Sequence, residues 1–304
     1  MRDSTSWDPG KVQSFGKMRA VMRLIRIEHT LFSLPFAYVG IVLSGFPYSL
    51  RTFLLSTLAV FGLRTAGMSF NNIADLEIDR RNPRTVKRPL VTGALSLRDA
   101  WVVVILGSAV YFTSAMLLNI YALLLSPILY AVAMSYPYAK RMHSLPHLHL
   151  GLSLGLVVFG GAIAASGSFV NSLQTALKTV PWLYLIGVTF WVAGFDILYS
   201  IMDIDYDRKE GLGSIPAKLG AFGAIKTSSI FYAVSSLSFF LAVHEYGLGE
   251  ISAASVAVSS LLMLLQVLIV RKDLSKIPMA FNLNLFIGIV VSAGTLLDVA
   301  LGYF

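Results

Sequence analysis

Nine long apolar segments constrain this chain more than any other feature of its sequence. Each is close to the ~20 residues that an α-helix needs to cross the hydrocarbon core of a bilayer. A chain of 304 residues that is 56% hydrophobic and 13% charged is too apolar for an ordinary soluble domain. The sequence therefore predicts an all-α, polytopic membrane protein. Its apolar segments occupy residues 28–46, 51–74, 98–117, 119–138, 148–168, 180–202, 222–243, 250–270 and 279–303.

The basic residues predict the orientation of these helices. If the N-terminus lies inside, 21 of the 24 Lys and Arg fall in inside segments. Only Arg51 and Lys178 fall outside, and Arg64 lies within an apolar segment. Cytoplasmic loops carry such an excess of positive charge. We therefore expect an integral membrane protein with a cytoplasmic N-terminus and with residues 1–27 forming a polar, interfacial lead-in to a transmembrane domain at 28–304. The net charge of +8 then reflects topology and contact with membrane lipid, so a nucleic-acid partner is not expected.

Two acidic segments, each at the inner end of an apolar segment, nearly repeat one another. Residues 73–81 and 201–209 share the order Ile, any residue, Asp, apolar, acid, apolar, Asp, Arg, basic. This duplication predicts two related halves that bring their acids together. Both segments fall on the side assigned to the cytoplasm.

Helical geometry selects some of these acids for one face. At about 100° per residue, residues four apart lie on the same side of a helix. The first stripe carries Asn71, Asn72, Asp75 and Asp79, in line with the intramembrane Arg64. The second stripe carries Asp196, Tyr199, Asp203 and Asp207. Glu77 and Asp205 are predicted to point away.

The selected side chains favour a particular metal chemistry. Carboxylates without nearby cysteine are hard oxygen ligands, which suit Mg²⁺ better than Zn²⁺, and the chain contains no cysteine. The three histidines of 143–149 have no acid nearby in sequence, so no metal site is expected there. Basic residues follow each acidic segment directly. Acids, Mg²⁺ and bases at the membrane surface together indicate a substrate with a diphosphate head and a hydrocarbon tail.

The first acidic segment resembles the NDxxDxxxD signature of the UbiA superfamily of intramembrane aromatic prenyltransferases, and the second resembles its DxxxD motif. The resemblance implies nine helices around a central cavity capped by cytoplasmic loops, and transfer of a prenyl group from a polyprenyl diphosphate to a small aromatic acceptor. It further implies two Mg²⁺ ions held by Asn72, Asp75, Asp79, Asp203 and Asp207, with Asn71 completing the first site. By the same resemblance the diphosphate would meet Arg80, Arg88, Lys140 and Arg208, whereas Arg141 would meet an acceptor carboxylate.

One position departs from the family pattern, because residue 72 is Asn where an Asp is usual. The missing charge implies weaker metal binding, although an amide oxygen can still be a ligand.

The acceptor stays open between 4-hydroxybenzoate or a similar phenolic carboxylate, which the resemblance favours, a dihydroxynaphthoate, and a glyceryl phosphate of ether-lipid synthesis. Two other classes compete. One is a secondary transporter, and the other is a lipid head-group transferase, whose DG-x-x-A-R element this sequence lacks.

Overall fold

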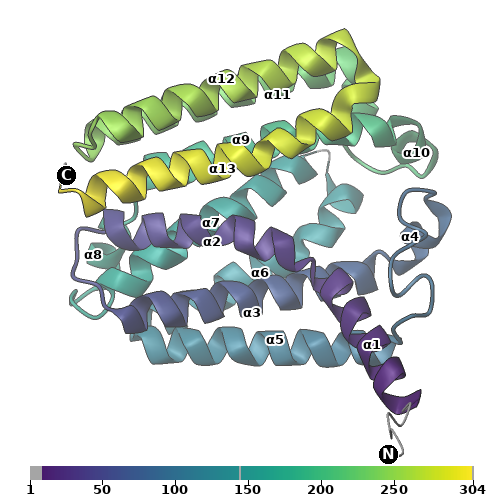
Figure 1. The fold of residues 1–304 in the computed structure, drawn as a ribbon, viewed down its shortest axis with the longest axis horizontal. Helices are drawn as coiled ribbons and strands as arrows, with labels where there is room; N and C mark the ends of the chain where they lie inside the picture. The colour runs from purple at the N-terminus through teal and green to yellow at the C-terminus, as the bar shows by residue number, and fades with distance from the viewer. Residues whose placement is uncertain (1–8, 144, 303–304) are drawn as a thin grey trace, which may run out of the picture.

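The computed structural model describes residues 9–143 and 145–302, and within them it contains helices and no strands. Most of the helices run side by side along the long axis of the molecule (Figure 1). The elements are α1 (Pro9–Ile25), α2 (Ile27–Leu43), α3 (Leu50–Ala74), α4 (Leu76–Arg81), α5 (Leu97–Leu118), α6 (Ile120–Met142), α7 (Pro146–Ser166), α8 (Leu173–Lys178), α9 (Trp182–Tyr199), the 3₁₀ turn η1 (Ser200–Asp203), α10 (Ile204–Lys209), α11 (Ile215–Glu245), α12 (Glu250–Lys272), the 3₁₀ turn η2 (Leu274–Lys276) and α13 (Ile277–Ala300).

Eight of the described helical segments are long and apolar enough to cross a membrane. The apolar part of α2, Phe32–Leu43, is shorter, but α2 packs against α3, α7 and α13 within the bundle. The predicted all-helical membrane fold is therefore confirmed. The expected count of nine corresponds to eight full-length spans and the shorter α2.

The small residues of α7 allow α2 and α9 to approach it closely. A Cβ atom built on Gly161 would lie 2.0 Å from the carbonyl oxygen of Ala37, and one built on Gly151 would lie 2.1 Å from that of Thr189. Neither position has room for a side chain. Small residues commonly permit such close packing between membrane helices, and these contacts place α7 inside the bundle.

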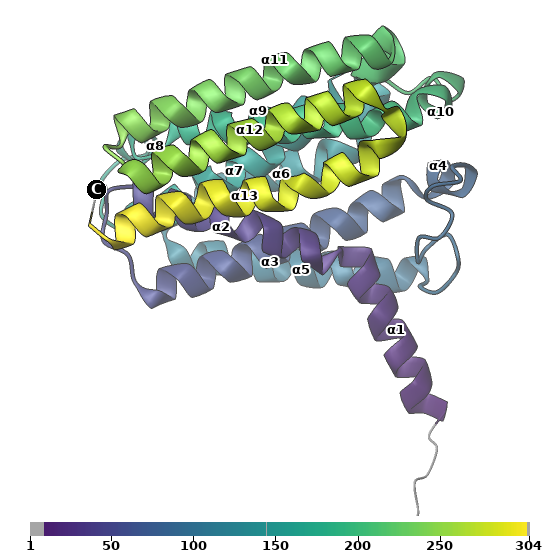
Figure 2. The same ribbon diagram turned by 45° about the horizontal axis from the view of Figure 1, so that its top comes forward.

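The two ends of the bundle differ in what caps them. The short helices α4 and α10 lie at one end, and α8 and the last turn of α13 lie at the other (Figures 1 and 2). Helix α1 projects from the end that carries α4, where Ala20 and Leu24 pack against Leu90 and Leu95 of the loop after α4. We call this loop, residues 82–96, the cap loop. Residues 1–8 of the predicted lead-in lie outside the described residues.

Candidate active site

A cavity of about 560 Å³ runs through the bundle from the α4 end. Charged and polar side chains from both acidic segments and from the cap loop line one part of it. Apolar side chains line the remainder, which reaches Leu118 and Ile163 near the far ends of α5 and α7. The cavity can therefore accommodate a molecule with an anionic head and a hydrocarbon tail.

Both acidic segments contain the same break in the helix. Helix α3 ends before Asp75, which adopts φ −93° and ψ 4° before α4 begins. Asp203 adopts φ −102° and ψ 5° at the corresponding place before α10. The helices are therefore interrupted in these segments, whereas the count of about 100° per residue assumes a continuous helix. The matching breaks show that the repeat in sequence is also a repeat in local backbone structure.

Most of the residues that the sequence selects do line this cavity. Eleven of them meet in it, from α3, α4, α6, α9, η1, α10 and the loops on either side of α4: Arg64, Asn71, Asp75, Asp79, Arg88, Lys140, Arg141, Asp196, Tyr199, Asp203 and Asp207. Glu77 and Asp205, predicted to point away, are exposed.

Three selected residues do not line the cavity. Asn72 is buried and donates a hydrogen bond to the carbonyl oxygen of Met68, at 2.8 Å, because it lies at the edge of the predicted stripe. Arg80 is exposed and pairs with Glu77 at 2.6 Å. Arg208 donates to the carbonyl oxygen of Ala217 at 2.8 Å. In the structure these three side chains lie outside the cavity, so we leave them out of the proposed site.

Arginines pair with three of the cavity acids. Arg88 contacts Asp79 at 2.5 Å, and Arg141 contacts Asp75 at 3.1 Å. Arg84 holds Asp203 with two hydrogen bonds, from Nε to Oδ1 at 3.1 Å and from Nη2 to Oδ2 at 2.8 Å.

Arg84 is absent from the set that the sequence selects. Among the basic residues of the cap loop nothing in the linear pattern distinguishes it, because its importance arises from a turn in which its backbone N–H donates to Asn82 Oδ1 at 2.9 Å. This pair joins the loop of the first acidic segment to the second segment.

Asp75 and Asp79 are largely shielded from water. Burial raises the pKa of Asp75 from 3.8 to about 6; the nearby Asp79 adds to the rise, and Arg141 opposes it. Burial likewise raises the pKa of Asp79, against the lowering effect of Arg88. The charge of the Asp75 and Asp79 carboxyl groups therefore depends on which counter-ions lie beside them.

The oxygen atoms of the site fit a hard divalent cation. Asp207 Oδ2 and Asn71 Oδ1 are buried without a hydrogen-bond partner, and such atoms are costly unless a ligand satisfies them. Within residues 9–143 and 145–302 no group of three or more His, Asp or Glu side chains converges as a ready metal cluster. Mg²⁺ commonly binds through one or two carboxylates together with substrate phosphates, so this arrangement suits a cation that arrives with its diphosphate.

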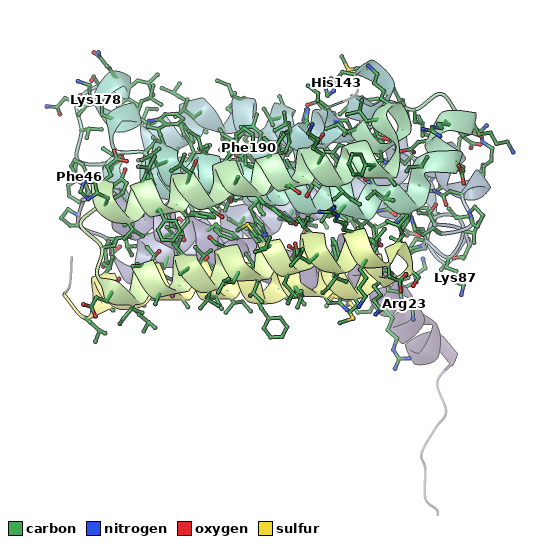
Figure 3. All side chains as sticks on the ribbon, turned by 90° about the horizontal axis from the view of Figure 1, so that it is seen from above. Arg23, Phe46, Lys87, His143, Lys178 and Phe190 are labelled. Carbon is green, nitrogen blue, oxygen red and sulfur yellow. The ribbon has the colours of Figure 1, made fainter. Side chains whose placement is uncertain are left out.

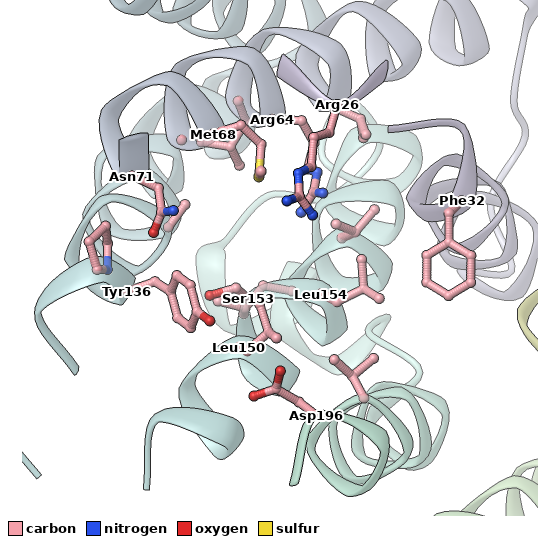
Figure 4. A pocket seen from close by; sticks show the side chains of 18 of the residues that line it. Arg26, Phe32, Arg64, Met68, Asn71, Tyr136, Leu150, Ser153, Leu154 and Asp196 are labelled. Atoms are coloured by element: carbon pink, nitrogen blue, oxygen red, sulfur yellow. The ribbon is translucent and has the colours of Figure 1, made fainter. Parts of the chain in front are cut away.

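A second group of polar side chains faces the cavity beside the acids. Figure 4 shows Arg64 and Asp196 on opposite sides of the pocket, with Tyr136 and Ser153 between them. The Nε atom of Arg64 is buried and has no hydrogen-bond partner. A buried guanidinium with a free donor is suited to binding an anion such as a carboxylate.

His147 is a residue of this region that sequence reasoning missed. Its Nδ1 atom lies 2.7 Å from Asp196 Oδ2, and its side chain is fully buried. The two residues are far apart in sequence, so spacing alone could not reveal the pair.

Comparison with known proteins agrees with this geometry. Residues 33–289 match the model of the UbiA prenyltransferase family. A 4-hydroxybenzoate octaprenyltransferase of Pseudoalteromonas translucida (strain TAC 125) is 33% identical over 280 residues, which are 91% of this chain and 92% of that protein.

Two solved structures have the same fold. The apo structure of a UbiA homolog from Aeropyrum pernix K1 is 57% identical, with a TM-score of 0.86, over 90% of this chain and 98% of that one. A UbiA homolog from Archaeoglobus fulgidus bound to GPP and Mg²⁺ is 21% identical, with a TM-score of 0.63, over 90% of this chain and 99% of that one. The chain is an integral membrane enzyme that belongs to the UbiA prenyltransferase family.

Proposed function

We propose that this prenyltransferase moves a prenyl group from an allylic polyprenyl diphosphate to a phenolic carboxylate such as 4-hydroxybenzoate, with Mg²⁺ as its cofactor. The observation that carries the proposal is the cavity itself. It joins a head of acids and arginines, an apolar channel and a separate buried arginine, Arg64, in one space. The name of the Pseudoalteromonas relative and the ligands of the Archaeoglobus homolog support the same substrates.

The acids of the two broken helices would hold the metal. They are Asp75 and Asp79 on one side, and Asp203 and Asp207 on the other, with Asn71 nearby. When bound, Mg²⁺ neutralises the charge that collects on the departing diphosphate.

The basic residues of the cavity would bind the remaining phosphate charge. Arg84, Arg88 and Lys140 all line the polar part of the cavity. Because Arg84 and Arg88 pair with Asp203 and Asp79, the protein supplies its own counter-ions for these acids. An arriving diphosphate with its cations would exchange partners with these pairs rather than place charges in an uncompensated cavity.

The acceptor would bind beside this head. Its carboxylate would pair with Arg64, and its ring would lie near Tyr136 and Ser153 (Figure 4). An allylic cation formed where the apolar channel begins would then meet the ring before water does. Orientation of the acceptor ring and exclusion of water would supply the remaining rate acceleration.

We also propose that the α4 end faces the cytoplasm. Figure 3 shows Arg23, Lys87 and His143 at this end and Phe46 and Lys178 at the other. Exposed Lys and Arg of α1, α4, the cap loop and α10 gather at this end, in line with the positive-inside rule.

Purified protein tests this function directly. It would be incubated with a prenyl diphosphate, with or without Mg²⁺, and with 4-hydroxybenzoate, a dihydroxynaphthoate or a glyceryl phosphate. We expect Mg²⁺-dependent prenylation of 4-hydroxybenzoate. A preference for the glyceryl phosphate would refute the acceptor, and equal turnover in EDTA would refute the metal.

Variants of Arg64 separate the acceptor site from the diphosphate site. Arg64→Met should raise the KM for the acceptor by about 10–100-fold, corresponding to the loss of one charge-assisted pair. The KM for the prenyl diphosphate should change little. Arg80→Met, which changes an arginine outside the cavity, is the matched control.

A further inference from the structure

The cavity acid Asp196 differs from its neighbours in its partner. Asp75, Asp79 and Asp203 each face an arginine. Asp196, which projects from α9 into the same cavity, instead receives a hydrogen bond from the ring of His147. Among the described residues, its Oδ1 atom has no hydrogen-bond partner in the protein, so one oxygen remains available to the cavity.

The backbone of α11 determines which nitrogen of His147 carries the proton. The N–H of Ile215, at the first turn of α11, has no acceptor within its own helix and donates to His147 Nε2 at 3.4 Å. Nε2 is therefore the acceptor, and Nδ1 carries the hydrogen that is donated to Asp196 at 2.7 Å. The arrangement matches a base oriented by a second group, a recurring device in proton transfer.

The position of Asp196 suits it to the acceptor rather than to the diphosphate. In Figure 4 it lies across the pocket from Arg64, with Tyr136 and Ser153 between them. A ring whose carboxylate meets Arg64 would therefore direct its opposite end, the phenolic hydroxyl, toward Asp196.

We propose that Asp196 accepts the proton that a phenolic acceptor loses on prenylation, and that His147 is the positioning residue that holds Asp196 for this step. The inference rests on the proposed phenolic acceptor. A neutral imidazole suits this purpose, because it orients the carboxylate by a hydrogen bond without placing a full positive charge beside the arriving proton.

The step balances in atoms and electrons. The allylic C–O bond breaks, and the diphosphate leaves with its electron pair. An electron pair of the ring forms the new C–C bond at the carbon next to the hydroxyl-bearing carbon. The phenolic proton passes to Asp196, which leaves a neutral dienone. Tautomerisation then moves the ring proton to oxygen and restores the phenol, so one proton per turnover remains on Asp196 until it leaves to water.

Three variants test the assignment in full-length protein reconstituted in nanodiscs. Asp196→Asn should lower kcat by about 100-fold or more, the scale of a lost general base, with the acceptor KM changed by less than about threefold. His147→Leu should lower kcat by about 10-fold or more. His147→Asn should restore most of this loss, because its amide N–H can replace Nδ1–H. Asp205→Asn, an exposed acid outside the cavity, should behave as wild type.

A series of ring-fluorinated 4-hydroxybenzoates gives a readout that a purely structural role would not change. Fluorine makes the phenol more acidic, so the deficit of Asp196→Asn should shrink along the series, whereas that of a misfolded variant would stay constant. Any of three results would overturn the proposal. They are a constant deficit along the series, wild-type turnover by Asp196→Asn, and a kcat of His147→Asn no higher than that of His147→Leu. If His147→Leu does not fold, the fluorinated series decides alone.

The failure of the proposed function would look different. In that case the wild-type protein would release diphosphate from its prenyl substrate without prenylating any phenolic acceptor. In contrast, efficient wild-type prenylation together with an unimpaired Asp196→Asn variant would refute only the role of Asp196.

Discussion

Arg84 offers the sharpest test of how the acids of the site are stabilised. Its guanidinium holds both oxygens of Asp203, whose side chain is only 8% exposed. Arg84→Met would leave that carboxylate buried without its counter-ion, which costs about 1–3 kcal/mol. The upper values for fully buried pairs do not apply, since the Arg84 side chain is 38% exposed and partly screened by solvent.

Thermal unfolding of the purified, metal-free protein measures this effect. For a domain of this size we expect an unfolding temperature lower on the order of 5 °C. Adding Asp203→Asn to Arg84→Met should recover much of the loss, because the uncompensated charge is then gone. Arg80→Met removes an arginine from an exposed pair and should change stability by less than about 0.5 kcal/mol.

For the same variant we predict that added metal has a larger stabilising effect than in wild type. Without Arg84, Asp203 is free to attract a cation, so Mn²⁺ alone should raise the unfolding temperature of Arg84→Met more than that of wild type. The KM for prenyl diphosphate should nevertheless rise, because a phosphate-binding arginine is lost. If Arg84→Met unfolds like wild type and responds equally to Mn²⁺, then Arg84 does not neutralise Asp203 and the reasoning is wrong.

Three further changes test other parts of the structure. Asp75→Ala should remove Mg²⁺-dependent turnover while Glu77→Gln, its exposed neighbour in the same segment, retains it; turnover by Asp75→Ala would exclude that acid from the site. Because burial raises the pKa of Asp75 to about 6, Mn²⁺ affinity measured by titration should fall by up to about tenfold per pH unit below pH 6 as protons compete, and a flat profile from pH 5 to 7 would contradict this. The same shift means that Asp75 stabilises the metal-free fold most below about pH 4, and that this contribution is lost as the pH rises through 6. Gly161→Ala would place a methyl group 2.0 Å from the Ala37 carbonyl oxygen and should destabilise the bundle by about 1–3 kcal/mol or more, whereas Gly160→Ala meets a side chain only at 3.8 Å and should be tolerated in the same unfolding assay.

Sequence periodicity grouped many of the residues that line the cavity, although the helices break at Asp75 and Asp203. Asp196, Tyr199, Asp203 and Asp207 share a stripe in the sequence and share the cavity in the structure. Asn72 shares the first stripe but does not line the cavity, because at the edge of the stripe its side chain turns toward the helix backbone.

Contacts between distant segments could not be read from the sequence. Arg84 meets Asp203 across 119 residues, and His147 meets Asp196 across 49. Both depend on how loops and helices pack, not on local spacing. Family membership decides against the transporter alternative that the sequence left open.

The two acidic segments are also joined directly to each other. The hydroxyl of Tyr206 donates to the carbonyl oxygen of Ile78 at 2.8 Å, and Arg81 pairs with Glu210 at 3.0 Å. Because these contacts join α4 to α10, we expect a displacement of either helix to displace the other. A cation captured by one half would therefore preorganise the other half for the next, and loading of the duplicated site should be cooperative.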